Sequence, residues 1–347
     1  MTEALLNARP RIRIDGERRP AMDSALLDCS IRLPLCGMAS CELRLVNWGS
    51  NPDAPNAGFA FNDIQPGKAI EISMGEEDDA PVFSGDITAI EERYGDGAPQ
   101  LILLAEDKLH LLARLRGNTA HEEMSIGDVI SQLAQEANLQ ADAAIDTLGT
   151  WHQLNESHLA FMIRLAAPHD IAIRLQDGQL RARAEEEDSQ PVELHAQNNV
   201  QRIRLIADLN QQPLGIQGRG YDFAADSDTE HDANDFTPAP AGTTAKDLLS
   251  ELSWGNEEIV AQPAAATQAD TEAWARGNFH RQAKRFVHGE IVTSGIPSLR
   301  SGREIELSGV SPRMLGRYQV VDCRHRFDSQ GYRTTIRVQR PDLGGEA

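Results

Sequence analysis

Residues 82–105 read VFSGDITAIEERYGDGAPQLILLA and predict a long antiparallel hairpin. One arm runs from Val82 to Arg93, and the other runs from Leu101 to Ala105. Gly95-Asp96-Gly97 lies between them and supplies the residue types that tight turns prefer. This hairpin predicts antiparallel β structure in the first part of the chain.

Neighbouring segments extend the same pattern. Arg11–Ile14, Ile31–Val46 and Ile70–Ile72 alternate apolar and polar residues, and turn residues such as Asp15-Gly16 separate them. Short strands at regular spacing, with no helix between them, favour a sandwich or a barrel over a parallel α/β sheet.

The middle of the chain carries helical signals instead. Ser125 and Asp128 resemble a capping box, and apolar residues then recur at helical spacing. A second helix is expected over residues 156–167, and Pro168 ends it because its ring removes a donor and clashes with the preceding turn. Asp177-Gly178 then predicts a two-residue hairpin turn.

The last third returns to β structure after acidic interruptions. The charge run Glu185–Asp188 is interpreted as a solvated junction, because like charges repel and seldom pack. Residues 224–242 hold no Lys or Arg and many Asp, Pro and Ala, so we expect a mobile loop there. Helices are expected near residues 244–252 and 270–286. Strands are expected at residues 201–209, 214–223, 289–292, 304–307, 318–326 and 332–339.

The composition limits the possible partners. The chain has 347 residues, of which 40% are hydrophobic and 25% are charged, as in ordinary folded proteins. Its formal net charge is −20, from 33 Lys and Arg against 53 Asp and Glu. This balance argues against a general nucleic-acid-binding surface and against docking on anionic lipid, since both need a basic footprint.

The lack of a visible targeting signal and the small number of cysteines together favour a cytosolic compartment. The N-terminus shows no secretory signal, and no apolar run approaches the length of a membrane-spanning helix. The cysteines fit no zinc spacing and are too few for a disulfide scaffold. We expect reduced thiols that serve mainly as packing groups. The four positions are Cys29, Cys36, Cys41 and Cys323.

A search for catalytic chemistry finds no constellation. His121-Glu122-Glu123 lacks the second histidine of a zinc-binding helix. Asp226–Glu230 begins like a calcium loop, but His231 stands where the sharp turn requires glycine. Cys323 and His325 share one face of an expected strand, which suits half of a metal site or, more simply, a packed face. No catalytic, cofactor-binding or metal-binding residue is therefore predicted, and no cofactor.

Two segments near opposite ends of the chain share a pattern. Gly85–Leu104 and Gly316–Val338 each read as strand, turn and strand, with a basic–aromatic pair just before a Gly/Asp turn. Common hairpin chemistry is one explanation. The other explanation is that two related β-barrels lie at opposite ends of one chain.

An ordered set of motifs runs through residues 10–340. The motifs lie at Val82–Glu91, Leu103–Leu112, Ser125–Leu139, Asn155–Ala166, Gly289–Gly302 and Gly316–Thr334. In this order they resemble contractile-tail baseplate hub proteins, the phage late-control gene D family, which is similar to the hub half of type VI secretion VgrG spike proteins. His158 departs from the pattern, because that family usually has aspartate there.

The resemblance implies a mainly β fold, with two similar antiparallel β-barrels forming a tube-like ring and a small α/β middle domain. It implies a first barrel at residues 1–118, a middle domain at 119–190 and a second barrel at 191–347. The second barrel would carry the acidic loop 224–242 and a helical insertion at 243–286.

The resemblance also implies a structural, non-enzymatic role. Such a hub is a homotrimer that joins a sixfold tail tube to a separate threefold spike and contacts other baseplate proteins, without stable nucleic-acid binding or membrane insertion. It would assemble in the bacterial cytoplasm and then reside in a virion tail baseplate or at an injection-particle tip. A tail-tip cell-wall hydrolase and an effector-loading adaptor are the alternatives. A negative channel wall that repels passing nucleic acid is a hypothesis for the net charge.

Overall fold

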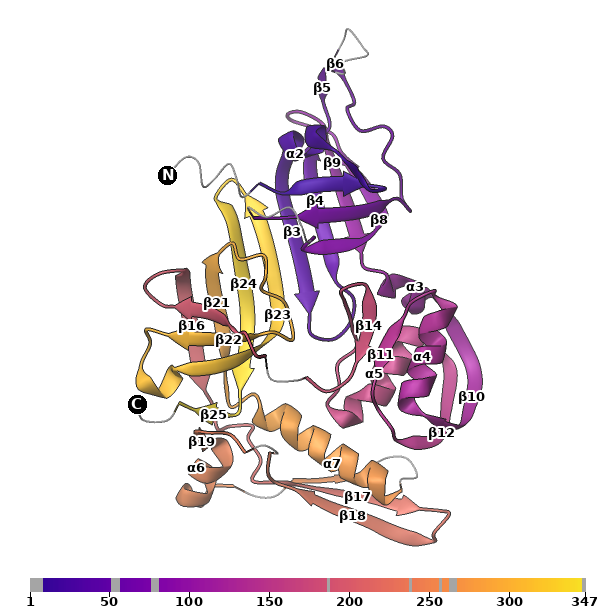
Figure 1. Cartoon of the computed structure of the whole chain (residues 1–347), viewed down its shortest axis with the longest axis vertical. Helices are drawn as coiled ribbons and strands as arrows, with labels where there is room; N and C mark the ends of the chain where they lie inside the picture. Colours follow the sequence, from indigo (N-terminus) through magenta and orange to yellow (C-terminus); the bar gives the residue numbers. More distant parts are fainter. Residues whose placement is uncertain are drawn as a thin grey trace.

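The first hundred residues form antiparallel strands around a buried apolar cluster (Figure 1). The computed structural model describes residues 9–50, 57–75, 81–185, 188–236, 239–255, 258–261 and 267–344. The elements here are β1 (Arg11–Ile14), β2 (Glu17–Arg18), α2 (Pro20–Ala25), β3 (Leu26–Pro34), β4 (Ser40–Val46), β5 (Gly49–Ser50), β6 (Ala57–Gly58), β7 (Ala69–Ser73), β8 (Phe83–Arg93) and β9 (Gln100–Glu106). The expected long hairpin is confirmed as β8–β9, in which Arg93 pairs with Gln100.

The middle region packs helices against two small sheets. Its elements are α3 (Leu109–Arg114), β10 (Arg116–Ser125), α4 (Ile126–Glu136), β11 (Ala141–Ala143), β12 (Leu148–Ser157), α5 (His158–Ala166), the 3-10 turn η1 (Ala167–His169), β13 (Arg174–Gln176) and β14 (Gln179–Ala182). The Ser125 hydroxyl accepts from the Asp128 amide at 3.0 Å, so the expected cap of α4 is confirmed. Asp177 and Gly178 have φ of 50° and 79°, as the expected hairpin turn requires. The β10–β12 ribbon was not expected.

The last third supplies a second set of long strands. These are β15 (Val192–His195), β16 (Val200–Ala207), β21 (Val287–Ser294), β22 (Glu304–Ser308), β23 (Gly316–Asp328) and β24 (Gly331–Arg340), with the short elements β19 (Thr243–Thr244), η2 (Pro312–Met314) and β25 (Asp342–Leu343). Their inward residues form a separate buried cluster that includes Ile291, Val320 and Ile336.

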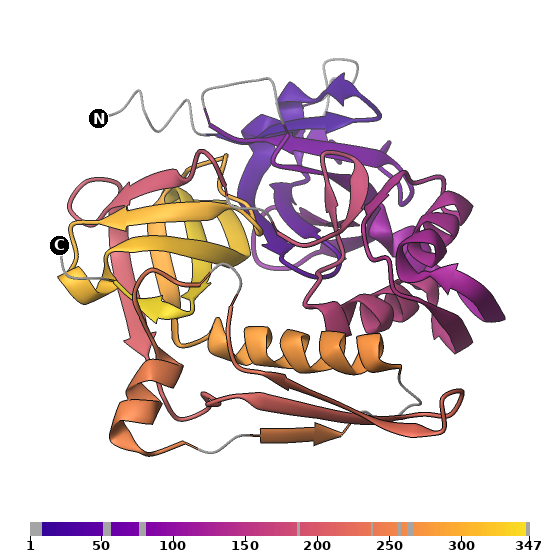
Figure 2. The ribbon, with the colours of Figure 1, turned by 60° about the horizontal axis from the view of Figure 1, so that its bottom comes forward.

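An inserted unit lies below both β regions in Figure 1 and corrects one prediction. It contains β17 (Ile216–Asp222), β18 (Ser227–Ala233), α6 (Ala245–Leu252), β20 (Glu258–Ala261) and α7 (Gln268–Ala283). The loop predicted at 224–242 is wrong for residues 227–233, which form β18. The acidic side chains of β18 are mainly exposed, whereas Thr229 is buried against α7 and its hydroxyl lies 2.7 Å from that of Thr271. Figure 2 shows α7 lying along this hairpin.

The two β regions join into one continuous sheet. Thirteen strands take part, and the main path is β16-β21-β24-β23-β3-β4-β9-β8-β7-β1-β2. The join is the pairing of β23 with β3, which runs from Asp322 opposite Pro34 to Phe327 opposite Cys29. The mainly β fold is confirmed, but the described strands form an open sheet and no closed barrel; one edge of β23 is shared between β22 and, beyond residue 321, β3 of the other half.

Both halves use the same strand order. The first half reads β3-β4-β9-β8-β7, and the second reads β16-β21-β24-β23-β22. The two hairpins that share a sequence pattern, β8–β9 and β23–β24, occupy equivalent places in this order. Beyond them the halves differ, since β1 is antiparallel to β7 whereas β15 is parallel to β22.

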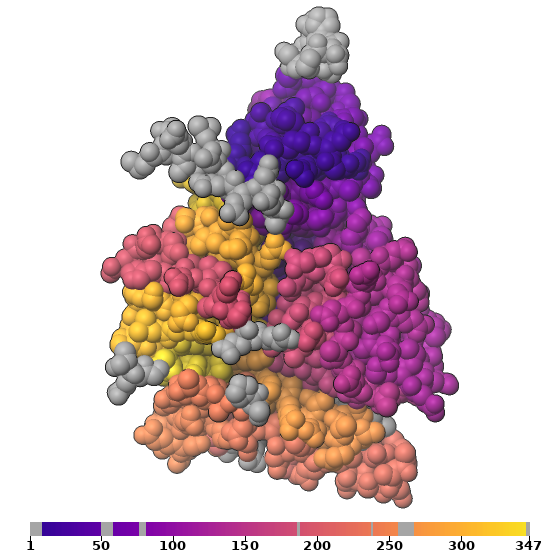
Figure 3. Space-filling model, in the orientation of Figure 1, coloured from indigo at the N-terminus to yellow at the C-terminus, as the bar shows by residue number. Residues whose placement is uncertain are grey.

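The three regions and the insertion occupy separate parts of the surface. Figure 3 shows the first half above, the middle region and the second half side by side, and the insertion across the bottom. None of the described helices combines the length and apolar character that crossing a bilayer requires.

Candidate functional site

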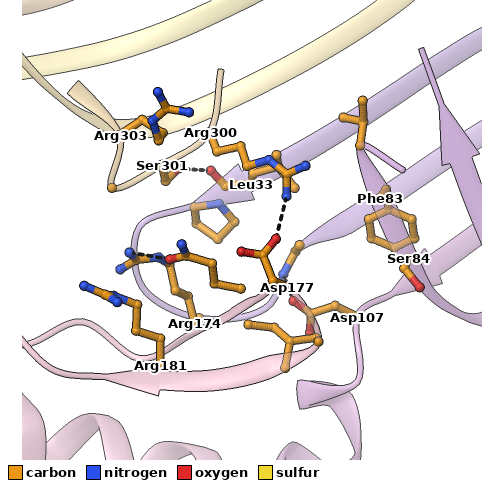
Figure 4. A pocket seen from close by; sticks show the side chains of 18 of the residues that line it. Leu33, Phe83, Ser84, Asp107, Arg174, Asp177, Arg181, Arg300, Ser301 and Arg303 are labelled. Atoms are coloured by element: carbon orange, nitrogen blue, oxygen red, sulfur yellow. Dashed lines mark hydrogen bonds and ion pairs between the residues drawn. The ribbon is translucent and has the colours of Figure 1, made fainter. Parts of the chain in front are cut away.

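A pocket of about 550 Å³ lies where the two β regions and the middle region meet (Figure 4). Its walls come from the start of β8, with Phe83 and Ser84, and from the β13–β14 hairpin, with Arg174 and Arg181. The segment 300–303, which leads into β22, forms the third wall. The pocket therefore joins segments that are far apart in the sequence.

The charges in this pocket are largely paired. Arg174 is only 6% exposed and donates to Glu185, with Nη2 lying 2.9 Å from Oε2. Arg303 donates to Asp188. Both acids belong to the run interpreted as a solvated junction, and that interpretation is wrong for these two residues. Residues 186–187 of the run lie outside the described residues. The pocket is therefore held by ion pairs that leave few free charges for a ligand.

A glycine in the segment 300–303 allows close packing in the pocket. Gly302 has φ +85°, and a Cβ there would lie 2.5 Å from the Arg174 guanidinium, so glycine allows the close approach.

Burial raises the pKa of Asp107 to about 6. Its carboxylate accepts from the amides of Ala39 at 2.8 Å and Leu109 at 2.9 Å. Asp107 thus fixes a chain turn between the first half and α3.

Cys323 and His325 lie together in the core, as the packed-face reading predicts. The Tyr332 hydroxyl donates to His325 Nδ1 at 2.8 Å, and Nε2–H donates to the Leu299 carbonyl at 3.0 Å. Cys323 Sγ lies 3.3 Å from Nε2. Burial lowers the pKa of His325 to about 4 and raises that of Cys323. A neutral imidazole and a protonated thiol make this a packing cluster.

His158 bridges α4 and α5 of the middle region. Gln153 donates to its Nδ1 at 3.0 Å, so Nε2–H donates to Glu136 at 3.0 Å. The side chain comes from the start of α5 and reaches the end of α4. The imidazole Nε2–H therefore ties the start of α5 to the end of α4.

The remaining residues noted in the sequence are dispersed. His121 is buried and stacks on Phe161 with ring centroids 5.6 Å apart. Asp226 accepts from the Tyr221 hydroxyl in the β17–β18 turn. Three cysteines are buried and Cys36 is exposed. Within the described ranges, no group of three or more His, Cys, Asp or Glu residues could hold a metal ion.

An arginine-rich hollow of about 660 Å³ lies on the polar face of the continuous sheet, across β16, β21, β24, β23 and β3. Some of its arginines are paired, including Arg32 with Asp322 at 3.0 Å and Arg202 with Glu290 at 2.6 Å. Sequence reasoning missed it, although outward positions of the expected strands at 318–326 and 332–339 contain the signal. The arginines are Arg32, Arg202, Arg324, Arg326, Arg333 and Arg337.

Solved structures share this fold over nearly the whole chain. The 43 kDa tail protein of prophage MuSo2 from Shewanella oneidensis has a TM-score of 0.72 at 14% identity, covering 96% of this chain and 99% of that chain. The tail protein from Neisseria meningitidis MC58 has a TM-score of 0.68 at 13% identity, covering 96% of each chain.

A third match extends the likeness to secretion machinery. The E. coli c3393 protein is described as a type VI secretion component with structural similarity to T4 bacteriophage tail proteins. It has a TM-score of 0.55 at 12% identity and covers 97% of this chain and 79% of that chain. The predicted resemblance to tail and VgrG-type hub proteins is thereby confirmed at the level of the fold.

Sequence comparison identifies a family. No curated protein matches the chain. A family model described as the Alg8 N-terminal domain matches residues 40–329, which is most of the chain. The chain therefore belongs to the Alg8 N-terminal domain family.

Proposed function

We propose that this protein is the baseplate hub of a contractile tail or injection machine, where three copies adapt a sixfold tube to a threefold spike. The observation that carries the proposal is the strand order repeated in the two halves of one chain. Three copies present six similar β units, which is the number a sixfold tube contacts. The same three copies present one threefold axis to a spike.

The separate apolar clusters support the proposed division of the chain. One cluster is built mainly from residues 12–105, a second from residues 109–182 and a third from residues 194–338. We assign them to a first hub unit at 1–118, a middle domain at 119–190 and a second hub unit at 191–347. In each hub unit, closure into a barrel-like ring is completed by neighbouring units rather than within the unit.

Light scattering and electron microscopy test this role. The purified chain, alone and mixed with tail-tube and spike proteins, is expected to reach three times its 38.1 kDa mass and to form rings with a central channel. A chain that stays monomeric at every concentration, with both partners present, contradicts the proposal. Clearing of peptidoglycan by the purified chain would establish the hydrolase alternative instead.

A further inference from the structure

The two halves correspond in detail at their outer strands. The β3–β4 ladder has a bulge between Leu26 and Asp28, and the β16–β21 ladder has one between Val200 and Arg202. A bulge fixes the register of the strands on either side of it. The match therefore aligns β3 with β16 residue by residue, with Asp28 equivalent to Arg202.

A second bulge aligns the inner strands. The β8–β9 ladder shifts between Ile87 and Ala89, and the β23–β24 ladder shifts between Val320 and Asp322. The backbone around the bulge also agrees, because the Ile87 amide donates to the carbonyl of residue 68 and the Val320 amide donates to that of residue 303, both at 2.9 Å. Ala89 is thus equivalent to Asp322.

The equivalent strands differ in what pairs with them. In the second half, β23 pairs with β3 beyond its bulge, and Phe327 is only 8% exposed in the apolar cluster of the first half. In the first half, the pairing of β8 with β7 ends at Asp86. Tyr94, the counterpart of Phe327, is 63% exposed. Among the described strands, none pairs with the β8 edge at residues 89–94.

The strand that would fill this edge is open too. Among the described strands, β16 is hydrogen-bonded to β21 alone, so its other edge carries unpaired backbone groups. Ile206 on β16 is 36% exposed, and Tyr94 contacts the exposed Phe59 with ring centroids 6.1 Å apart. Long open edges with apolar side chains are templates for pairing with another chain.

We propose that β16 of one copy pairs antiparallel with residues 89–94 of a second copy, in the register that β3 adopts on β23. This rests on the proposed trimeric hub and names its interface. The register places Arg204 opposite Arg93 and Ile206 opposite Glu91 across the two copies. Each copy then continues the sheet of the next.

The side chains at the proposed junction differ from those at the junction within the chain. Within the chain, Arg32 and Asp322 form an ion pair across the β3–β23 junction at 3.0 Å. Their counterparts are Ile206 and Ala89, so the junction between copies replaces that ion pair with an apolar contact. In this pairing, the Tyr94 side chain of one copy packs beside the apolar residues of β16 of the other copy, just as Phe327 packs in the apolar cluster of the first half. The contact is head-to-tail, which closes into a ring when the rotation allows.

Cysteine crosslinking tests the register. In a Cys36→Ser background, Glu91→Cys with Ile206→Cys is expected to give covalent dimers and trimers on mild oxidation, and reductant should dissolve them. The control pair, Glu91→Cys with Ala207→Cys, is one residue out of register, which places the thiols on opposite faces, and is expected to give none. A light-scattering trimer that the in-register pair does not crosslink overturns the strand pairing but leaves the hub. A persistent monomer overturns both.

A matched pair of surface variants provides a second measurement. Tyr94→Asp is expected to weaken self-association by about tenfold or more, because it places a charge in the junction. Phe223→Asp changes an aromatic residue of similar exposure, 74%, on the β17–β18 turn and is expected to leave association unchanged. Circular dichroism should show both variants folded. Equal effects of the two substitutions would contradict the assignment of this edge.

Discussion

His325 is expected to make the protein lose stability in mild acid. Its imidazole is fully buried, and burial lowers its pKa to about 4 from an ordinary 6.5. The unfolded chain therefore binds a proton below pH 6.5 that the native state binds only near pH 4. Stability falls as the pH drops through this window and levels off below it.

The size of the loss follows from the shift in pKa. At 1.36 kcal/mol per pKa unit, His325 contributes a loss of about 2 kcal/mol in the free energy of unfolding between pH 7 and pH 5. His325→Gln removes this titration, and its amide can still donate to Leu299 and accept from Tyr332. The variant can be less stable overall, but its change between the two pH values should be smaller by that amount.

Urea unfolding followed by tryptophan fluorescence measures the effect at both pH values. Carboxylates that titrate in the same range, such as Asp107, are present in both proteins and cancel in the comparison. His152→Gln, at an exposed position on β12, serves as the matched control and should behave like the wild type. If wild type and His325→Gln lose the same free energy between pH 7 and pH 5, the assignment of His325 as a buried neutral imidazole is wrong.

Three further outcomes are expected. Arg174→Met should lower the free energy of unfolding by about 2–4 kcal/mol in urea titrations, because it leaves the half-buried Glu185 carboxylate without its cation; a loss as small as that of an exposed ion pair would contradict this. Ser125→Ala should cost about 1 kcal/mol by removing the cap of α4, whereas Ser125→Gly should cost only a few tenths, and equal losses would refute the capping role. A thiol reagent should modify one cysteine in the native protein and four in urea, because Cys36 is exposed and the other three thiols are buried; rapid native modification of more than one would contradict the buried positions of the others.

Local signals were enough to predict most of the elements. Ser125 predicted a helix start, Asp177-Gly178 predicted a hairpin, and the 82–105 segment predicted β8–β9. Each of these signals acts through backbone geometry within a few residues, so distant parts of the chain do not alter it. The order of the motifs then identified the fold.

Long-range arrangements could not be predicted in this way. The acids of β18 lack an apolar pattern, and the strand forms because α7 covers Thr229, a contact that depends on residues forty positions apart. Glu185 and Asp188 read as solvated until Arg174 and Arg303 are placed beside them. The net charge likewise cannot show on which face of the sheet the acidic side chains lie, so it does not by itself support a negative channel wall. On its polar face, six arginines border one hollow with two acids, Glu290 and Asp322, so the excess negative charge is not concentrated there.

The strand β23, shared by both halves, has a mechanical consequence for a ring of such chains. Half of the junctions lie within a chain, where the backbone is covalently continuous and ion pairs such as Arg32 with Asp322 bridge the strands. In the proposed ring, the other half lie between copies, where strand pairing would join the sheets and no ion pair takes the place of Arg32 with Asp322. Under load, the ring should part at alternate junctions and open as three stiff double segments, so it can widen around a passing object while each segment keeps its shape.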